Sequence, residues 1–126
     1  MRVLVADDDA FARELVGILL QGTGLAAVEA EDGCQAIVEF EKKPFRIALI
    51  DMIMPNRDGL ETIMELRRRW PATRIIAMSA GSRFLRRADA LQWAVGLGAD
   101  MAIEKPFDMT AFGSVIDEQL KLAPAA

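Results

Sequence analysis

Carboxylate side chains follow two of the apolar runs in this chain, and their number suggests a cation site. Asp7, Asp8 and Asp9 come directly after Val3–Ala6, and Asp51 directly follows another apolar run. If Asp7, Asp8 and Asp51 lie together, each pair repels by roughly 4 kcal/mol at ~4 Å with an effective dielectric constant near 20. Such a cluster needs a positive ion, and hard oxygen ligands favour Mg²⁺ over zinc. The pattern therefore predicts that Asp7, Asp8 and Asp51 bind Mg²⁺.

Two more polar side chains follow later apolar runs. Ser79 comes directly after Ile75–Met78, and Lys105 comes one residue after Met101–Ile103. Lys105 would cancel one carboxylate charge of three, and a divalent ion would neutralise the rest. Because Mg²⁺ recruits phosphate oxygens, Asp51 could attack a phosphoryl group as a nucleophile while Ser79 and Lys105 hold its oxygens. These residues together predict a phosphoryl-acceptor site.

The elements that must position these residues are five short apolar runs, separated by stretches of helical periodicity. The expected strands are Val3–Ala6, Ala26–Val28, Ile47–Ile50, Ile75–Met78 and Met101–Ile103. This alternation predicts an α/β fold with a doubly wound, five-stranded parallel sheet, five helices and the flavodoxin-like strand order 2-1-3-4-5. The first, third and fourth strands are continuously apolar and are expected inside the sheet, with the second at an edge. Ligands bind at the carboxyl ends of such strands, so the polar residues should converge there.

Apolar residues at helical spacing predict which faces of the helices meet the sheet. One further helix is expected over Gly33–Glu41, Asp9 is expected to cap the first helix, and Asp58-Gly59 is expected to be a turn and helix start. The expected core-facing residues are Phe11, Leu15, Ile18 and Gly22, then Leu60, Ile63 and Met64, then Phe84, Ala88, Leu91 and Val95, and finally Phe112, Ile116 and Leu120.

The composition excludes several classes of function. The chain has 126 residues, a formal net charge of -4, no histidine and one cysteine, Cys34. This length suits one domain, expected over residues 1–122 with a short tail at 123–126, and no output domain is expected after it. The negative charge disfavours nucleic acid and membrane partners, and the lack of histidine excludes the usual zinc sites and His-based catalysis. Without a signal peptide or ~20 consecutive apolar residues, the protein is expected to be cytoplasmic.

Four segments, in order and each at the end of an expected strand, resemble the signature segments of the response-regulator receiver family of two-component signalling. They are VLVADDD, LIDMIMPNRDG, IIAMSA and GADMAIEKPF. Together they span nearly the whole chain. The resemblance implies a stand-alone phosphoacceptor switch rather than an enzyme, which binds a partner or relays phosphate when phosphorylated.

The resemblance also implies a role for each site residue. Asp51 would accept the phosphoryl group from a histidine kinase or phosphotransfer protein. Mg²⁺ would be held by Asp8, Asp51 and the backbone carbonyl of Ile53, with Asp7 acting mainly through a metal-bound water. Ser79 would be the conformational-switch hydroxyl, and Lys105 would contact the phosphoryl oxygens.

The chain departs from the family pattern at positions tied to signal readout. Typical members carry an aromatic residue three positions before the lysine, where this chain has Ala102, and the stretch from Ser79 to Lys105 is about one helical turn longer. Our hypothesis is that this longer loop and the first turn of the fourth helix carry the response instead. In this family the residues at Ile53 and Gly81 influence phosphoryl lifetime, and neither can position a water, which predicts slow-to-moderate self-dephosphorylation.

A downstream partner is expected at the face formed by the fourth helix, fifth strand and fifth helix, where partners of receivers generally read phosphorylation. Arg83, Arg86, Arg87 and Trp93 belong to the expected fourth helix or its start. They fit a partner-binding face, since Trp and Arg are enriched in interface hot spots, and they fit a solvated basic surface equally well.

Three alternative functions fit parts of this pattern. A phosphatase of the haloacid-dehalogenase type needs an acid–base aspartate two residues after the nucleophile, where this chain has Ile53. A flavodoxin-like protein needs a loop that accepts the FMN phosphate, which Asp7, Asp8 and Asp9 would repel. A receiver that is never phosphorylated and serves as a scaffold is disfavoured by the complete set of site residues, although Ala102 keeps this alternative open.

Overall fold

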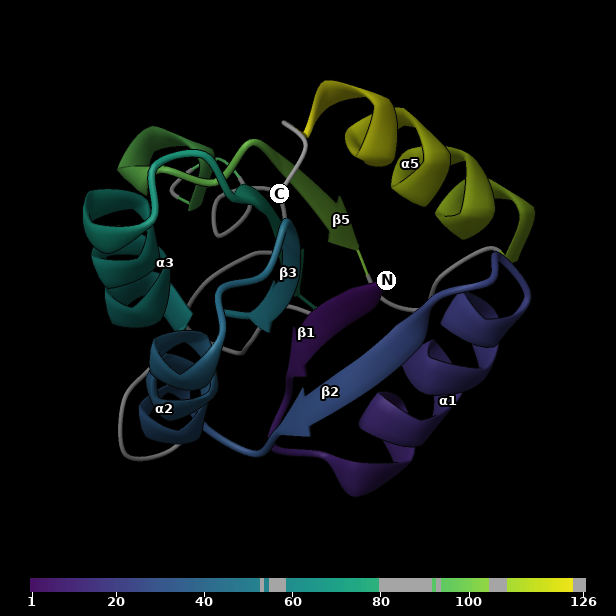
Figure 1. The fold of residues 1–126 in the computed structure, drawn as a ribbon, viewed down its shortest axis with the longest axis horizontal. Helices are drawn as coiled ribbons and strands as arrows, with labels where there is room; N and C mark the ends of the chain where they lie inside the picture. The colour runs from purple at the N-terminus through teal and green to yellow at the C-terminus, as the bar shows by residue number, and fades with distance from the viewer. Residues whose placement is uncertain (53, 55–58, 80–91, 93, 105–108, 124–126) are drawn as a thin grey trace.

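The chain forms a parallel sheet covered by helices on both faces (Figure 1). The computed structural model describes residues 1–52, 54, 59–79, 92, 94–104 and 109–123. The strands are β1 (Arg2–Ala6), β2 (Ala26–Ala30), β3 (Ile47–Asp51), β4 (Arg74–Ser79) and β5 (Met101–Glu104). The helices with described bounds are α1 (Ala10–Gln21), α2 (Gly33–Lys42), α3 (Gly59–Arg69) and α5 (Met109–Leu122). Helical backbone at residues 92 and 94–97 lies where the fourth helix is expected to end.

The sheet has the order β2-β1-β3-β4-β5, and all four neighbouring pairs are parallel. The predicted fold class, strand order and edge position of β2 are therefore confirmed. Each strand starts or ends up to two residues outside its apolar run, because backbone pairing continues past the apolar side chains. In β2, for example, pairing with β1 continues to Ala30, which lies opposite Ala6.

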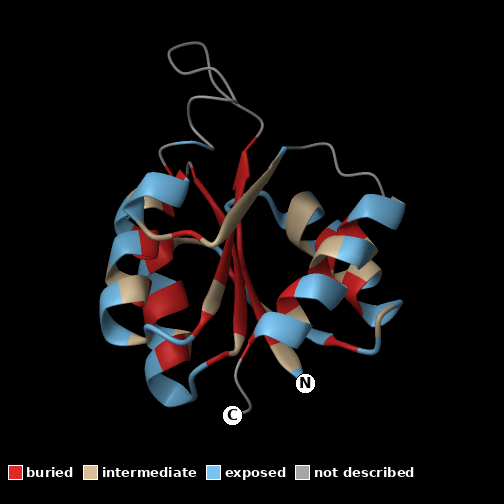
Figure 2. Cartoon of the chain, turned by 90° about the horizontal axis from the view of Figure 1, so that it is seen from above, coloured by how far each residue is buried: buried red, intermediate tan, exposed pale blue. Residues whose placement is uncertain are grey.

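Alternating side chains of the strands fill two cores, one on each face of the sheet. Leu4 points to the face covered by α2 and α3, where Phe40 and Ile63 pack. Val3 points to the opposite face, where residues of α1 and α5 pack against the sheet. Figure 2 shows the buried strands between these two layers of helices, with exposed residues on the outer helix surfaces.

The predicted core face of α1 is wrong. Phe11, Leu15 and Ile18 are 73%, 43% and 57% exposed, whereas Val16 and Leu20 are fully buried. Gly22, the fourth predicted position, is the C-terminal cap of the helix. Apolar residues occur on nearly the whole circumference of α1, so two overlapping stripes fit the helical period. Contact with α5 and the sheet buries one stripe and leaves the other in solvent.

Two further residues that the apolar pattern predicts in the core are exposed, and a neighbouring residue is buried in place of each. Met64 of α3 is 50% exposed while Ile63 and Leu66 are buried, and Val95 is 48% exposed while Ala94 is buried. A polar residue, Thr62, takes part in the buried face of α3, which the apolar pattern could not indicate. In α5 the predicted core residues Phe112 and Ile116 are buried, and Leu120 packs against the same cluster. Phe84, Ala88 and Leu91 lie outside the described residues.

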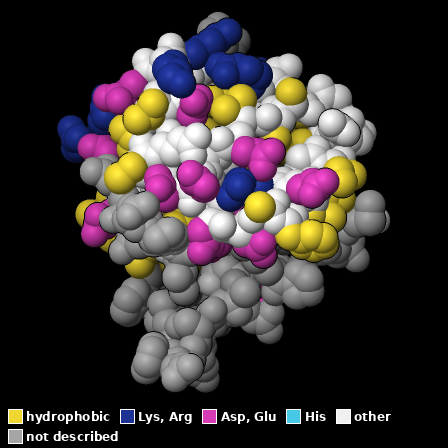
Figure 3. Space-filling model, turned by 90° about the horizontal axis from the view of Figure 1, so that it is seen from below, with side chains coloured by type: hydrophobic (Ala, Val, Ile, Leu, Met, Phe, Trp, Pro, Cys, Tyr) yellow, Lys and Arg dark blue, Asp and Glu magenta, His cyan; other side chains and the backbone are white. Residues whose placement is uncertain are grey.

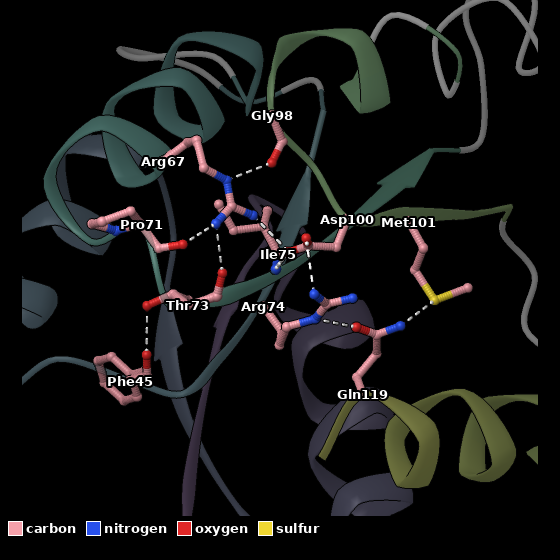
Figure 4. A network of polar contacts seen from close by, with 10 residues as sticks. All are labelled: Phe45, Arg67, Pro71, Thr73, Arg74, Ile75, Gly98, Asp100, Met101 and Gln119. Carbon is pink, nitrogen blue, oxygen red and sulfur yellow. Dashed lines mark hydrogen bonds and ion pairs between the residues drawn. The ribbon is translucent and has the colours of Figure 1, made fainter. Parts of the chain in front are cut away.

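A network of polar contacts joins α3, β4 and α5 at the amino ends of β4 and β5 (Figure 4). The Arg67 guanidinium donates to the Gly98, Pro71 and Thr73 carbonyls at 2.8, 2.6 and 3.0 Å, and pairs with an Asp100 carboxylate oxygen at 2.6 Å. That same Asp100 oxygen accepts the backbone N–H of Ile75 at 2.8 Å. The network therefore anchors the end of the sheet that lies opposite the predicted site.

In the described part of the chain, no helix is both long enough and apolar enough to cross a bilayer.

Candidate phosphoryl-acceptor site

The sheet brings the predicted site residues of β1, β3 and β4 to one edge. Ala6 lies opposite Ile50 in the β1–β3 pair, so Asp7 and Asp51 follow at neighbouring positions. Asp51 lies opposite Met78 in the β3–β4 pair, and Ser79 is the last residue of β4. Parallel strands present their carboxyl ends together, which explains how residues distant in sequence share one edge.

Three carboxylates converge at this edge. One oxygen each from Asp7, Asp8 and Asp51 lies within 4.8 Å of the others. Asp7 and Asp51 are 1% and 8% exposed, while Asp8 is exposed. Three hard oxygen donors, two held within the protein and one at the solvent boundary, fit a Mg²⁺ ion that keeps some of its own waters. The chemistry of the donor set therefore agrees with the predicted metal.

Short contacts fix the loop that carries Asp7 and Asp8. The Asp7 N–H donates to the Ala30 carbonyl at 3.1 Å, which extends the β1–β2 ladder by one bond. The Asp7 carboxylate accepts the Asp9 N–H at 3.0 Å, and Asp9 in turn accepts the Phe11 N–H at 3.0 Å as the cap of α1. The predicted capping role of Asp9 is confirmed. The first acidic segment is thus held between a strand end and a helix start.

The start of α3 packs directly on the backbone that carries Asp51. The Gly59 N–H donates to the Met52 carbonyl at 3.0 Å, and the Met52 N–H donates to the Met78 carbonyl at 3.0 Å. A Cβ atom built on Gly59 would lie 2.0 Å from the Asp51 carbonyl oxygen and 2.4 Å from the Met52 Cα. Only glycine fits this contact, so Gly59 has a role beyond the predicted turn and helix start.

The buried Ser79 hydroxyl group lies at the end of β4, next to the strand that carries Asp51. Ser79 lies opposite Glu104, the last residue of β5, in the register of the β4–β5 pair. Lys105 and Ile53 lie outside the described residues, so their predicted contacts stay predictions. Ala102 is partly buried against the core on the α2 and α3 face.

One further residue, which the sequence did not indicate, contacts this loop. Arg13 of α1 donates to the Asp7 backbone carbonyl at 2.7 Å and to the Glu29 carboxylate at 3.0 Å. The available signal was a basic residue one turn into a helix that begins just after the aspartates. Its contact with a backbone carbonyl rather than with a carboxylate of the site could not be read from sequence.

A doubly wound parallel sheet with an acidic cluster at its carboxyl edge is the arrangement of a receiver domain. The family model described as "Response regulator receiver domain" matches residues 3–117. The chain therefore belongs to the response regulator receiver domain family.

Relatives of different lengths show this similarity. The chemotaxis protein CheY of Bacillus subtilis is 32% identical over 120 residues, which cover 94% of this chain and 97% of that protein. The response regulator GtcR of Aneurinibacillus migulanus is 34% identical over 96% of this chain, which spans only 48% of that protein. The crystal structure of the NtrX receiver domain from Brucella abortus superposes with a TM-score of 0.86 at 26% identity, covering 94% of this chain and 98% of that one.

Proposed function

We propose that this chain is a single-domain response regulator that accepts a phosphoryl group on Asp51 from a histidine kinase or phosphotransfer protein. The observation that carries the proposal is the convergence of Asp7, Asp8 and Asp51 within 4.8 Å at the carboxyl edge of the sheet. In this proposal residues 1–122 form the receiver and 123–126 a short tail. The protein acts in the cytoplasm as a switch or phosphate relay and not as a classical enzyme.

The proposed reaction is an in-line transfer to a carboxylate. An Asp51 carboxylate oxygen attacks the phosphorus atom, and the bond between phosphorus and the donor breaks as the new P–O bond forms. Asp8, Asp51 and the Ile53 carbonyl would hold Mg²⁺, with Asp7 acting through a bound water. The bound ion would neutralise negative charge on the phosphoryl oxygens. The Ser79 hydroxyl and the Lys105 ammonium would donate hydrogen bonds to the same oxygens.

The exposed stripe of α1 supports the proposed phosphodonor partner. Phe11, Leu15 and Ile18 lie on the outer face of α1, and Phe11 is only two residues from Asp9. Figure 3 shows the side of the molecule where β2, α1 and α2 lie, with exposed apolar groups beside acidic ones. A donor that delivers a phosphoryl group to Asp51 has to approach this edge, and the stripe offers it an apolar contact.

We expect Leu15→Ser to lower the rate of phosphotransfer from any histidine kinase that phosphorylates the wild-type chain by about 10-fold. Full burial of a Leu side chain contributes about 1.5–3 kcal/mol, and about 1.4 kcal/mol corresponds to a tenfold change in rate. Phosphorylation by acetyl phosphate should stay unchanged, because this small donor needs no protein interface. Radiolabel transfer measured with both donors checks this. Val38→Ser on α2, which removes a similarly exposed apolar side chain, is the control. Equal losses with both donors would contradict the docking role.

The readout is proposed to use the face formed by the fourth helix, β5 and α5. Ala102 cannot act as the usual aromatic switch. The longer loop after Ser79 and the first turn of the fourth helix, which lie outside the described residues, are therefore proposed to carry the response when Ser79 binds the phosphoryl group. If backbone amide shifts over residues 80–87 stay the same on phosphorylation, this route is wrong.

Slow-to-moderate self-dephosphorylation is proposed from Ile53 and Gly81, and a phosphoryl lifetime of only seconds would contradict it.

The direct test of function is Mg²⁺-dependent uptake of one phosphoryl group. The full chain is incubated with acetyl phosphate, either with Mg²⁺ or with EDTA, and its intact mass is followed over time. We expect an adduct of one phosphoryl group with Mg²⁺ and at least 100-fold slower formation with EDTA, because the metal neutralises charge in the transition state. Equal rates in both buffers, or no adduct at all, would overturn the proposed function.

A further inference from the structure

Arg13 links three elements around the acidic edge of the sheet. Its side chain leaves α1, and Nη1 donates to the backbone carbonyl of Asp7 at 2.7 Å. Its Nε donates to the carboxylate of Glu29 on the edge strand β2 at 3.0 Å. The side chain is 15% exposed, whereas the Glu29 side chain is 51% exposed. Arg13 is therefore held between the loop that carries two site carboxylates and the outer strand of the sheet.

The hydrogen bond to Asp7 acts on the peptide group between two site residues. The Asp7 carbonyl belongs to the peptide bond that joins Asp7 to Asp8, so its direction influences where both side chains point. A guanidinium donor on a carbonyl oxygen at 2.7 Å is a short, charge-assisted hydrogen bond, which is stronger than a neutral one. The contact with Glu29 is half exposed and contributes less, mainly by orienting the guanidinium group.

We propose that Arg13 is a positioning residue for the metal site, which holds the Asp7–Asp8 peptide so that both carboxylates face Asp51. This proposal rests on the proposed function, because it concerns Mg²⁺ binding at the same edge. The contacts of Arg13 are with the Asp7 carbonyl and the Glu29 carboxylate, so in this proposal it acts without binding Mg²⁺ or the phosphoryl group itself. It acts as an outer-shell partner of the site through the Asp7 backbone, and the loss of such partners commonly lowers metal affinity 10–100-fold.

A purely electrostatic role for Arg13 predicts the opposite effect on metal binding. The guanidinium group places a positive charge next to the loop that carries Asp7 and Asp8, and this charge opposes the entry of a cation. If charge alone mattered, removal of Arg13 would strengthen Mg²⁺ binding. If positioning matters, removal would weaken it. The sign of the change in Mg²⁺ affinity therefore separates the two roles.

The test is calorimetric titration of Mg²⁺ into the full chain without a phosphodonor. We expect Arg13→Gln to weaken Mg²⁺ affinity about 10-fold, and Arg13→Lys to weaken it less, because lysine keeps a donor but lacks the planar fork that reaches both partners. Glu29→Gln should change the affinity by less than about threefold, since the Asp7 contact remains. Arg68→Gln is the charge-matched control, because Arg68 is 71% exposed on α3 and pairs only with Glu65 among the contacts found in the described residues.

Tighter or unchanged Mg²⁺ binding by Arg13→Gln would overturn the positioning role. So would an equal loss of affinity in Arg68→Gln. Thermal unfolding in EDTA shows whether Arg13→Gln is folded, and if it is not, the result for Arg13→Lys decides. If the wild-type chain binds Mg²⁺ but takes up no phosphoryl group from acetyl phosphate, the proposed function is wrong. The titration alone then decides the role of Arg13.

Discussion

The variant Asp51→Asn is expected to take up no phosphoryl group from acetyl phosphate. An amide is a far poorer nucleophile toward phosphorus than a carboxylate, and the replacement also removes one of three oxygen anions that converge within 4.8 Å. We expect an adduct on at least nine-tenths of wild-type molecules under conditions that leave the variant unmodified by intact mass. Asp117→Asn, which neutralises an exposed carboxylate on α5, should behave as wild type.

The same variant should lose most of the stabilisation that Mg²⁺ gives the folded chain. A ligand at a concentration of 100 times its Kd stabilises the native state by about 2.7 kcal/mol, and a site without Asp51 should keep only a small part of this. In EDTA, Asp51→Asn should be at least as stable as wild type, because one repulsive carboxylate is gone. Urea unfolding with and without Mg²⁺ measures both effects. Equal Mg²⁺ stabilisation of variant and wild type would contradict the metal site.

The variant Gly59→Ala is expected to destabilise the fold by about 3 kcal/mol or more. Its Cβ atom would lie 2.0 Å from the Asp51 carbonyl oxygen and 2.7 Å from the Asp51 carbonyl carbon, and these are backbone atoms that cannot rotate away. Forced overpacking typically costs 1–3 kcal/mol, and a clash with backbone belongs at or above the upper end of that range. The remaining folded molecules must shift α3 or the end of β3, so we also expect slower phosphorylation of Asp51.

The matched control for this variant is Gly113→Ala in α5. Gly113 lies inside a helix, and among the described residues no atom beyond its chain neighbours and the nearby backbone of that helix lies within 4 Å of a Cβ atom built on it. Alanine there should stabilise the chain by about 0.5–1 kcal/mol, because alanine has the higher helix propensity. Chemical unfolding of both variants provides the comparison. If Gly59→Ala is as stable as Gly113→Ala, the close packing of α3 on the Asp51 backbone is wrong.

The sheet could be predicted from sequence because its strands are nearly continuous apolar runs. Runs such as Ile47–Ile50 are too short for a buried helix and fit interior parallel strands, and neighbouring parallel strands present their carboxyl ends together. The convergence of Asp7, Asp8 and Asp51 followed from this topology. These residues are the part of the site for which a local signal, a carboxylate at the end of an apolar run, is sufficient.

The packing of the helices could not be predicted in the same way. In α1, the helical period fits the stripe with Phe11 and Leu15 as well as the stripe with Val16 and Leu20, and contact with the sheet and α5 selects the second. The missing space beside Gly59 likewise depends on how closely α3 approaches β3. Tertiary contacts of this kind leave no periodic trace in the sequence.

The contacts of long polar side chains could not be predicted from the sequence either. Arg13 spans from α1 to the Asp7 carbonyl and the Glu29 carboxylate, and Arg67 spans from α3 to the loop before β5. Several of these partners are backbone carbonyls, which every residue carries, so residue type gives no hint of them. A charged side chain that positions backbone looks in sequence like any solvated surface charge.

The measurement that tests the central claim most directly is the location of the phosphoryl group. Wild-type chain phosphorylated by acetyl phosphate with Mg²⁺ can be reduced with borohydride, which converts an aspartyl phosphate to homoserine, and the product can be sequenced by tandem mass spectrometry. We expect homoserine in place of Asp51 and unmodified aspartate at positions 7, 8 and 9. Homoserine at one of those three positions with intact Asp51, or no converted aspartate in a chain that carries the adduct, would contradict the assignment of Asp51 as the phosphoacceptor.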